Sequence, residues 1–282
     1  MRSAALLLLV GCVLDVGSVE ETDDGSEVVS IAASADSFAC VRPESPSTAN
    51  GGYSCSGSPS LVYSTLCAEN ASYDVSLVAS APDMTMAVLA PHGGKIEANT
   101  DVIALALAGE LGLPHFAFIA HATASCLDKY GGPNRSNHRA LHITSTHFND
   151  VRAESLMRSV NRGIALHGHD RANKICVGGI TPALRTAFKS YYDTNARQYS
   201  PSGTTAVIAT GDADCAGITG TAADNISNRS RAGAGLQLEM SLTFRSELVT
   251  SRNGDRRLWN SFRNAVRAAC RVSLGGVKGC GG

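Results

Sequence analysis

The segment Val88–Asp101, VLAPHGGKIEANTD, changes character at its midpoint. It begins inside the apolar run Met86–Ala90, which predicts a buried strand. A proline, His92 and the pair Gly93–Gly94 then interrupt the run, and Glu97 follows three residues later. Glycine permits the tight backbone turn that such a break requires. The segment predicts either a plain strand-to-helix turn or a turn that brings an imidazole and a carboxylate to one metal ion.

Apolar runs and amphipathic segments alternate from about residue 61 onward, which indicates strands alternating with helices. The runs that predict strands are Met86–Ala90, Phe116–Ala120, Ala140–Thr144, Ile164–Gly168, Lys174–Gly178, Ala206–Thr210 and Leu236–Met240. The segments that predict helices are Asp101–Leu111, Val151–Asn161, Thr181–Arg197 and Leu258–Ser273. Several runs are apolar almost throughout, as buried central strands are. We therefore expect an α/β fold, a three-layer α/β/α sandwich with a mixed, mostly parallel sheet.

The overall composition excludes some classes of partner. The 282-residue chain has 44% hydrophobic and 17% charged residues, as a globular protein has. Its formal net charge of -1 provides no basic field, so we expect no nucleic-acid partner. Beyond the N-terminus, no apolar run reaches the roughly 18 residues that suggest a membrane span, so we expect no internal span.

The N-terminus has the pattern of a secretory signal peptide, in which a positive charge precedes a short apolar core and small residues. We expect this signal peptide to cover residues 1–17. Within it, Leu9–Cys12 resembles a bacterial lipoprotein box, which would attach a lipid anchor to Cys12. A leader rich in serine and glycine, with two cysteines, follows over residues 18–60, and the main domain covers residues 61–282.

The cysteines also favour export. Nine occur, and eight remain when Cys12 is set aside. They are Cys40, Cys55, Cys67, Cys126, Cys176, Cys215, Cys270 and Cys280. An even number in an exported chain favours disulfides, and the lack of any CxxC pair argues against a thiolate zinc site. We expect a protein that is secreted, or held by a lipid on the outer face of a membrane.

Three residues that could carry chemistry lie at or near predicted strand ends: His92, His167 and Glu239. In α/β sheets, functional groups gather beyond the carboxyl ends of the strands. Zinc binds three or four nitrogen, oxygen or sulfur donors, and His92 with Glu97 would supply two of them. Taken alone, that pair favours a plain turn. A third donor would have to come from His142 or His167.

Glu239 and Arg229 each admit two interpretations. The alternation of Gln237 and Glu239 with apolar residues predicts either an edge strand with both side chains in solvent or a buried general base near a metal-bound water. Arg229 precedes a glycine-rich turn, where it would bind a substrate carboxylate, stabilise an oxyanion or remain a solvated loop residue. Ser145 lacks the G-x-S-x-G context of a serine nucleophile.

Four sequence blocks occur in order along the chain. They are APHGGKIEANTD (Ala90–Asp101), LHITSTHFND (Leu141–Asp150), IALHGHD (Ile164–Asp170) and NISNRSRAGAGLQLEMSLTFR (Asn225–Arg245). Together they resemble the poly-γ-glutamate hydrolase family of phages, bacteria and fungi. The members of that family are zinc hydrolases with a fold like that of the zinc carboxypeptidases. The resemblance covers roughly Tyr63–Arg245.

The resemblance implies a zinc (Zn2+) site made by His92, Glu97 and His167. His142 is the alternative third ligand, and otherwise supports the ligands or contacts the substrate. Glu239 matches the general base of the family. Residues 61–282 would then form a zinc carboxypeptidase-like hydrolase domain.

Arg229 matches a conspicuous position of the last block, which implies roles in catalysis and in binding a substrate carboxylate, with Arg245 as a further contact. The implied protein is a secreted, monomeric, zinc-dependent hydrolase of γ-glutamyl amide bonds, with poly-γ-glutamate as its substrate. Because that polymer is anionic, we expect a locally basic groove. A zinc carboxypeptidase, a peptidoglycan amidase or a non-catalytic binding protein of the same fold would share the site residues.

Overall fold

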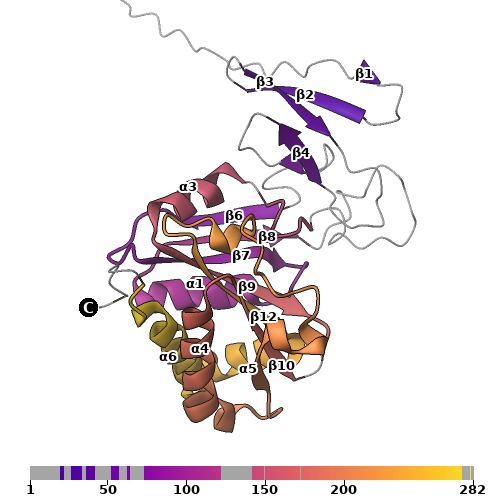
Figure 1. Ribbon diagram of the computed structural model, residues 1–282. Coiled ribbons are helices and arrows are strands. Elements are labelled where there is room, and N and C mark those ends of the chain that lie inside the picture. The colour runs from indigo at the N-terminus through magenta and orange to yellow at the C-terminus, as the bar shows by residue number, and fades with distance from the viewer. Residues whose placement is uncertain are drawn as a thin grey trace, which may run out of the picture.

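The computed structural model describes residues 73–121, 142–148, 150–171, 173–274 and 280, together with five strands nearer the N-terminus (Figure 1). These strands are β1 (Glu20–Glu21), β2 (Glu27–Ala33), β3 (Asp36–Val41), β4 (Gly52–Ser56) and β5 (Val62–Tyr63), which pair antiparallel in chain order. The predicted signal peptide, the lipoprotein box and Cys12 lie outside the described residues. The predicted leader contains β1 to β4, and its separation from the main domain stays a prediction.

The main sheet has seven strands in the order β11-β10-β12-β9-β7-β8-β6. They are β6 (Tyr73–Val78), β7 (Met86–Gly94), β8 (His115–Ala120), β9 (Arg162–His169), β10 (Lys174–Gly178), β11 (Thr205–Ile208) and β12 (Ala234–Ser241). β7 pairs in parallel with β8 and β9, as do β9 with β12 and β10 with β11. The β6–β8 and β10–β12 pairs are antiparallel. The predicted mixed, mostly parallel sheet is confirmed.

Helices cover both faces of this sheet (Figure 1). They are α3 (Val151–Ser159) on one face and α1 (Thr100–Leu111), α4 (Pro182–Tyr191), α5 (Leu242–Asn253) and α6 (Arg257–Arg271) on the other. In β7, Met86 and Val88 pack into the core shared with α1 and α6, whereas Ala87 and Leu89 pack into the core shared with α3. Residues 86–90 of this strand are apolar throughout because both of its faces are buried. The predicted three-layer sandwich is confirmed.

Short helical turns complete the described chain. They are η3 (Tyr192–Ala196), η4 (Arg197–Tyr199), η5 (Ala209–Gly211), η6 (Ala213–Cys215) and η7 (Ile226–Asn228). The predicted helix Thr181–Arg197 is therefore α4 followed by a π-helical turn and the start of a 3-10 turn. Thr181 is its N-cap, and the proline after it is the first helical residue.

Among the strands and α-helices of residues 73–274, three elements differ from the sequence-based expectation. The strand expected at Ala140–Thr144 is wrong, because its described residues, 142–144, have no strand pairing. β6 was not expected because it is an edge strand with a partly exposed, partly polar sequence. α5 was not expected because it follows β12 without a loop, and only the Ser241 hydroxyl, which accepts a hydrogen bond from the Phe244 amide, marks its start.

Two disulfides join described residues, Cys176–Cys215 and Cys270–Cys280. The first ties β10 to η6, and the second ties the end of α6 to the C-terminal segment. They agree with the expectation that an even set of cysteines forms disulfides. In the part of the chain that the structure describes, no helix combines the length and the apolarity needed to cross a bilayer.

The turn after β7 depends on two glycines that lie against the backbone of β8. A Cβ atom on Gly93 would lie 2.5 Å from the Phe118 carbonyl oxygen, and one on Gly94 would lie 2.2 Å from that of Ala120. Gly94 also has φ of +67°, a left-handed conformation that side chains disfavour. The Glu97 amide then donates to the His92 carbonyl at 2.8 Å, which folds the glutamate back beneath the histidine.

We expect Gly94→Ala to lower the free energy of unfolding by about 1–3 kcal/mol, because it adds backbone strain and a steric clash. Gly109→Ala is the matched control. Gly109 lies inside α1 with no atom within 4 Å of an added Cβ, so this change should raise stability by about 0.5–1 kcal/mol. Urea denaturation of both variants measures the two effects, and equal stabilities would contradict the packing of the turn.

Candidate metal centre

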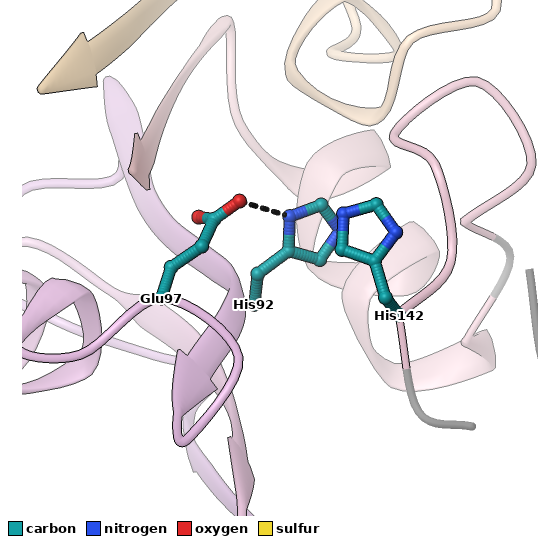
Figure 2. A group of neighbouring side chains, drawn as sticks. All are labelled: His92, Glu97 and His142. Carbon is teal, nitrogen blue, oxygen red and sulfur yellow. Dashed lines mark hydrogen bonds and ion pairs between the residues drawn. The ribbon is translucent and has the colours of Figure 1, made fainter. Parts of the chain in front are cut away.

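Three donor groups converge at the carboxyl ends of β7 and β9. His92 Nδ1 lies 2.9 Å from Glu97 Oε1 and 3.1 Å from His167 Nδ1, and His167 Nδ1 lies 3.5 Å from Glu97 Oε2. Both imidazoles are buried, with 3% of His92 and 2% of His167 exposed. In Figure 2 the Glu97 carboxylate points at His92. The structure thus brings together the three residues that the sequence predicts as zinc ligands.

The outer nitrogens of both histidines face fixed partners. His92 Nε2 lies 2.6 Å from the carbonyl oxygen of Ile143, and His167 Nε2 lies 3.1 Å from the Ser145 hydroxyl. A carbonyl can only accept, so His92 carries a proton on Nε2. Its Nδ1 faces the Glu97 carboxylate, which also can only accept. This contact therefore requires a proton or a metal cation between Nδ1 and the carboxylate.

The donor set fits zinc. A tetrahedral zinc ion with bonds of about 2.0–2.1 Å holds its ligands about 3.3 Å apart. The three donor separations, 2.9, 3.1 and 3.5 Å, bracket that value. Imidazole and carboxylate donors also suit this ion, and outer-nitrogen hydrogen bonds of the observed kind commonly orient its histidine ligands.

His142 also lies within reach of this cluster. Its ring centroid is 4.1 Å from that of His92, with the rings tilted by 36°, and Figure 2 shows the two rings side by side. One donor atom each from His92, Glu97 and His142 lie within 4.8 Å of one another. The set that contains His167 is more tightly gathered, so His142 fits better beside the ligands than among them.

The charge on Glu97 is stabilised from several sides. Its Oε2 accepts a hydrogen bond from the Gly168 amide at 2.7 Å. Burial raises the pKa of Glu97, but the charges and hydrogen bonds of His92 and His167 outweigh burial and hold that pKa well below its usual range. The carboxylate is therefore ionised, as a metal ligand must be.

Glu239 lies beside this cluster on β12, paired in register with His167 of β9. Only 6% of Glu239 and 3% of Gln237 is exposed, so the solvent-facing edge-strand interpretation is wrong. Burial raises the pKa of Glu239 to about 8; the charge of His167 opposes this shift and that of Glu97 adds to it.

A chain of buried amides holds the Glu239 carboxylate. Gln237 Nε2 donates to Glu239 Oε1 at 2.7 Å, and Asn225 Nδ2 donates to Gln237 Oε1 at 2.8 Å. Sequence reasoning missed Gln237 and Asn225 as site residues. The spacing of Gln237 two residues before Glu239 was the available signal, because alternate residues of a strand share one face.

A pocket of about 420 Å³ opens onto these groups. Its walls are His92, Glu97, His142, residues 144–146, His167, Gly168, residues 217–222, Asn225, Gln237 and Glu239. None of these described wall residues is a lysine or an arginine. The basic groove that the sequence led us to expect is therefore not formed by them.

The structure places Arg229 outside the pocket walls. Its guanidinium donates to the carbonyls of Thr146, Phe148 and Asp224 and to the carboxylate of Glu154. We call residues 142–148 the strap, because they cross the site and carry Ile143 and Ser145. Arg229 binds the strap from behind rather than facing the pocket.

Arg245 is also outside the described pocket walls. It is 4% exposed, donates to the Ala98 carbonyl, and lies so close to Gly168 that an added Cβ there would be 2.5 Å from its guanidinium carbon. Burial lowers the pKa of Arg245, whereas the charges of Glu97 and Glu239 raise it. Arg245 thus supports the turn that carries Glu97 and balances the charge of two carboxylates.

Relatives of known sequence match most of this chain. The UPF0714 protein YndL of Bacillus subtilis (strain 168) is 31% identical over 176 residues, which are 62% of this chain and 60% of that protein. The SPbeta prophage-derived UPF0714 protein YoqZ of the same strain is 29% identical over 177 residues, 61% of this chain and 56% of that one. The chain therefore spans less than two thirds of the length of either relative.

A solved structure of a bacteriophage poly-gamma-glutamate hydrolase matches with a TM-score of 0.55 and 23% identity, covering 72% of this chain and 90% of that one. At this identity the likeness establishes the fold alone. The profile of the poly-gamma-glutamate hydrolase family matches residues 63–267. Because that match covers more than half of the chain, the predicted resemblance is confirmed: this protein belongs to the poly-gamma-glutamate hydrolase family.

Proposed function

We propose that this protein is a secreted zinc-dependent hydrolase of γ-glutamyl amide bonds, with an anionic γ-glutamyl polymer or peptide as substrate. The observation that carries the proposal is the convergence of His92 Nδ1, His167 Nδ1 and the Glu97 carboxylate at an open pocket. A buried glutamate, Glu239, lies beside them. Membership of the family agrees with hydrolysis, and the two disulfides agree with a location outside the cell.

His92, Glu97 and His167 are the proposed zinc ligands. When bound, zinc would polarise the substrate carbonyl and make a water molecule a nucleophile near neutral pH. The Ile143 carbonyl and the Ser145 hydroxyl keep the two ring Nδ1 atoms directed at one point. His142, whose ring lies against that of His92, is the proposed support of that ring and a substrate contact.

Glu239 is the proposed general base. It takes a proton from the attacking water and returns it to the nitrogen of the leaving amine, which completes hydrolysis of the amide. Gln237 occupies Oε1 of Glu239, so Oε2 is the oxygen left to exchange the proton. Burial favours this exchange because it brings the pKa of the carboxyl closer to neutral pH.

Arg229 takes a different part from the one that the resemblance implied. Its hydrogen bonds go to the strap, to Asp224 and to Glu154, so we propose that it positions the strap and does not touch the substrate. Arg245 is proposed in the same way to position the Glu97 turn. The remaining wall residues must then recognise the substrate.

The third ligand can be tested by metal binding. We expect His167→Ala to weaken zinc binding more than about 100-fold, since it removes a ligand, and His142→Ala to weaken it by about tenfold or less. Competition with a chromogenic chelator measures both. His121→Ala is the control. The ring of His121 pairs with the carboxylate of Asp74 at a distance of 2.8 Å and is not part of the cluster. A larger loss in His142→Ala than in His167→Ala would exchange the two assignments.

The base assignment can be tested by activity at constant metal content. We expect Glu239→Gln to retain zinc and to lower kcat on poly-γ-glutamate by at least about 100-fold, because the amide cannot accept the proton. Peptidoglycan fragments and ordinary peptides should be poor substrates of the wild type. Normal turnover by Glu239→Gln would refute the role of this residue as general base. Preference of the wild type for another polymer would show that the proposed substrate class is wrong.

Arg229 can be tested by stability and local exchange. We expect Arg229→Met to lower the free energy of unfolding by about 2 kcal/mol, because it leaves Glu154 and two strap carbonyls without this partner. Amide exchange in the strap should also become faster. Arg231→Met is the matched control: Arg231 is exposed, and its guanidinium bonds only Asn161 among described residues, so the change should stay within about 0.5 kcal/mol. Equal effects of the two changes on stability and on amide exchange would contradict the positioning role of Arg229.

A further inference from the structure

The substrate proposed above carries carboxylates, yet the described pocket walls hold no lysine or arginine. Arg229 and Arg245 both donate to backbone carbonyls and do not themselves line the pocket. Away from the histidines and the proposed metal, recognition of an anion by these walls therefore depends on neutral donors. One wall segment, residues 217–222, differs from the rest in how its peptide groups are engaged.

Three successive carbonyls of this segment are bound on the protein side. The Ile218 carbonyl accepts from Gln237 Nε2 at 3.3 Å, and that of Thr219 accepts from the Gly179 amide at 2.9 Å. The Gly220 carbonyl accepts from Asn228 Nδ2 at 2.8 Å. All three partners are buried, so the carbonyls are directed into the protein.

The amide N–H groups of the same three peptides point the other way. In a trans peptide the N–H is antiparallel to the C=O, and the described chain has no cis peptide. The N–H groups of Thr219, Gly220 and Thr221 are therefore directed away from the buried partners. None of them has a hydrogen-bond acceptor among the described residues, and all three residues line the pocket.

The backbone conformation gathers these donors. Gly217 has φ of +83° and Gly220 has φ of +61°, so the segment contains two residues in the left-handed conformation. Left-handed residues also occur in the backbone nests that bind anions. The segment is held at both ends, by the Cys176–Cys215 disulfide and by Asn228. Donors fixed in this way bind a charge without reorganisation.

We propose that residues 217–222 form a carboxylate-binding subsite, in which the N–H groups of Thr219, Gly220 and Thr221 bind a carboxylate of the substrate. The proposal rests on the proposed function for the identity of the ligand, since each residue of a γ-linked glutamyl chain carries a free carboxylate next to the backbone. It assigns substrate selection to backbone groups beside the metal donors, and bond cleavage to those donors and Glu239.

The test removes one N–H and varies the charge of the ligand. Thr221→Pro deletes the N–H, and the substrates are a γ-glutamyl oligomer and its analogue with carboxamides in place of carboxylates. We expect Thr221→Pro to raise KM for the carboxylate substrate about tenfold or more, as loss of a hydrogen bond to a charged group does, and to leave KM for the carboxamide unchanged.

Ala223→Pro is the matched control. Ala223 lies outside the pocket walls and occupies the second position of a turn closed by the hydrogen bond from the Asn225 amide to the Ala222 carbonyl, where proline is favoured. It should leave both KM values unchanged. Equal KM changes for the two substrates, or none in Thr221→Pro, would overturn the subsite.

Direct binding separates this proposal from the proposed function. Calorimetry with glutarate and glutaramide, which need no turnover, should show that the wild type binds only the dicarboxylate and that Thr221→Pro weakens this binding. Where thermal melting shows that Thr221→Pro is unfolded, Thr219→Pro removes the neighbouring N–H instead. Equal affinity of the wild type for the two ligands would overturn the subsite even if γ-glutamyl amides are hydrolysed. Glutarate binding without hydrolysis would overturn the proposed function alone.

Discussion

The hydrogen bond from His92 Nε2 to the Ile143 carbonyl determines the chemistry of the site. Because a carbonyl cannot donate, this bond places a proton on the outer nitrogen and directs Nδ1 toward Glu97. Ser145, two residues farther along the strap, contacts Nε2 of His167 through its hydroxyl, which can donate or accept. One short segment therefore orients both imidazoles, and small displacements of the strap would move two of the three donors together.

The strap is in turn held by groups distant in sequence. The Ile226 amide donates to the Ser145 carbonyl at 2.8 Å, and Arg229 binds the carbonyls of Thr146 and Phe148. Both residues belong to the turn that leads into β12, the strand that carries Glu239. The segment that runs from Ile226 to Glu239 thus holds the strap at one end and carries the proposed base at the other. This linkage gives a physical reason for the ordered sequence blocks, because each block supplies one side of the same site.

The parts of this arrangement that the sequence could predict are those set by local pattern. The strands β7, β9 and β12 are mostly apolar because they are buried on both faces, and His92, His167 and Glu239 were placed near their ends by position alone. Arg229 could not be assigned in this way, because its partners, Thr146 and Glu154, lie more than 70 residues away. The segment 140–144 also resembled a strand, although its Ile143 carbonyl bonds a histidine side chain and not a neighbouring strand.

Backbone hydrogen-bond donors cannot be identified as binding groups from the sequence, for a more general reason. A peptide N–H is present at almost every residue, so only its environment distinguishes a binding group from an ordinary one. In residues 217–222 that environment is created by Gln237, Gly179 and Asn228, which take the carbonyls and leave the amides unpaired among the described residues. Gln237 also donates to Glu239, so one buried side chain connects the anion-binding wall with the proposed base. Recognition and proton transfer would then depend on the orientation of a single amide.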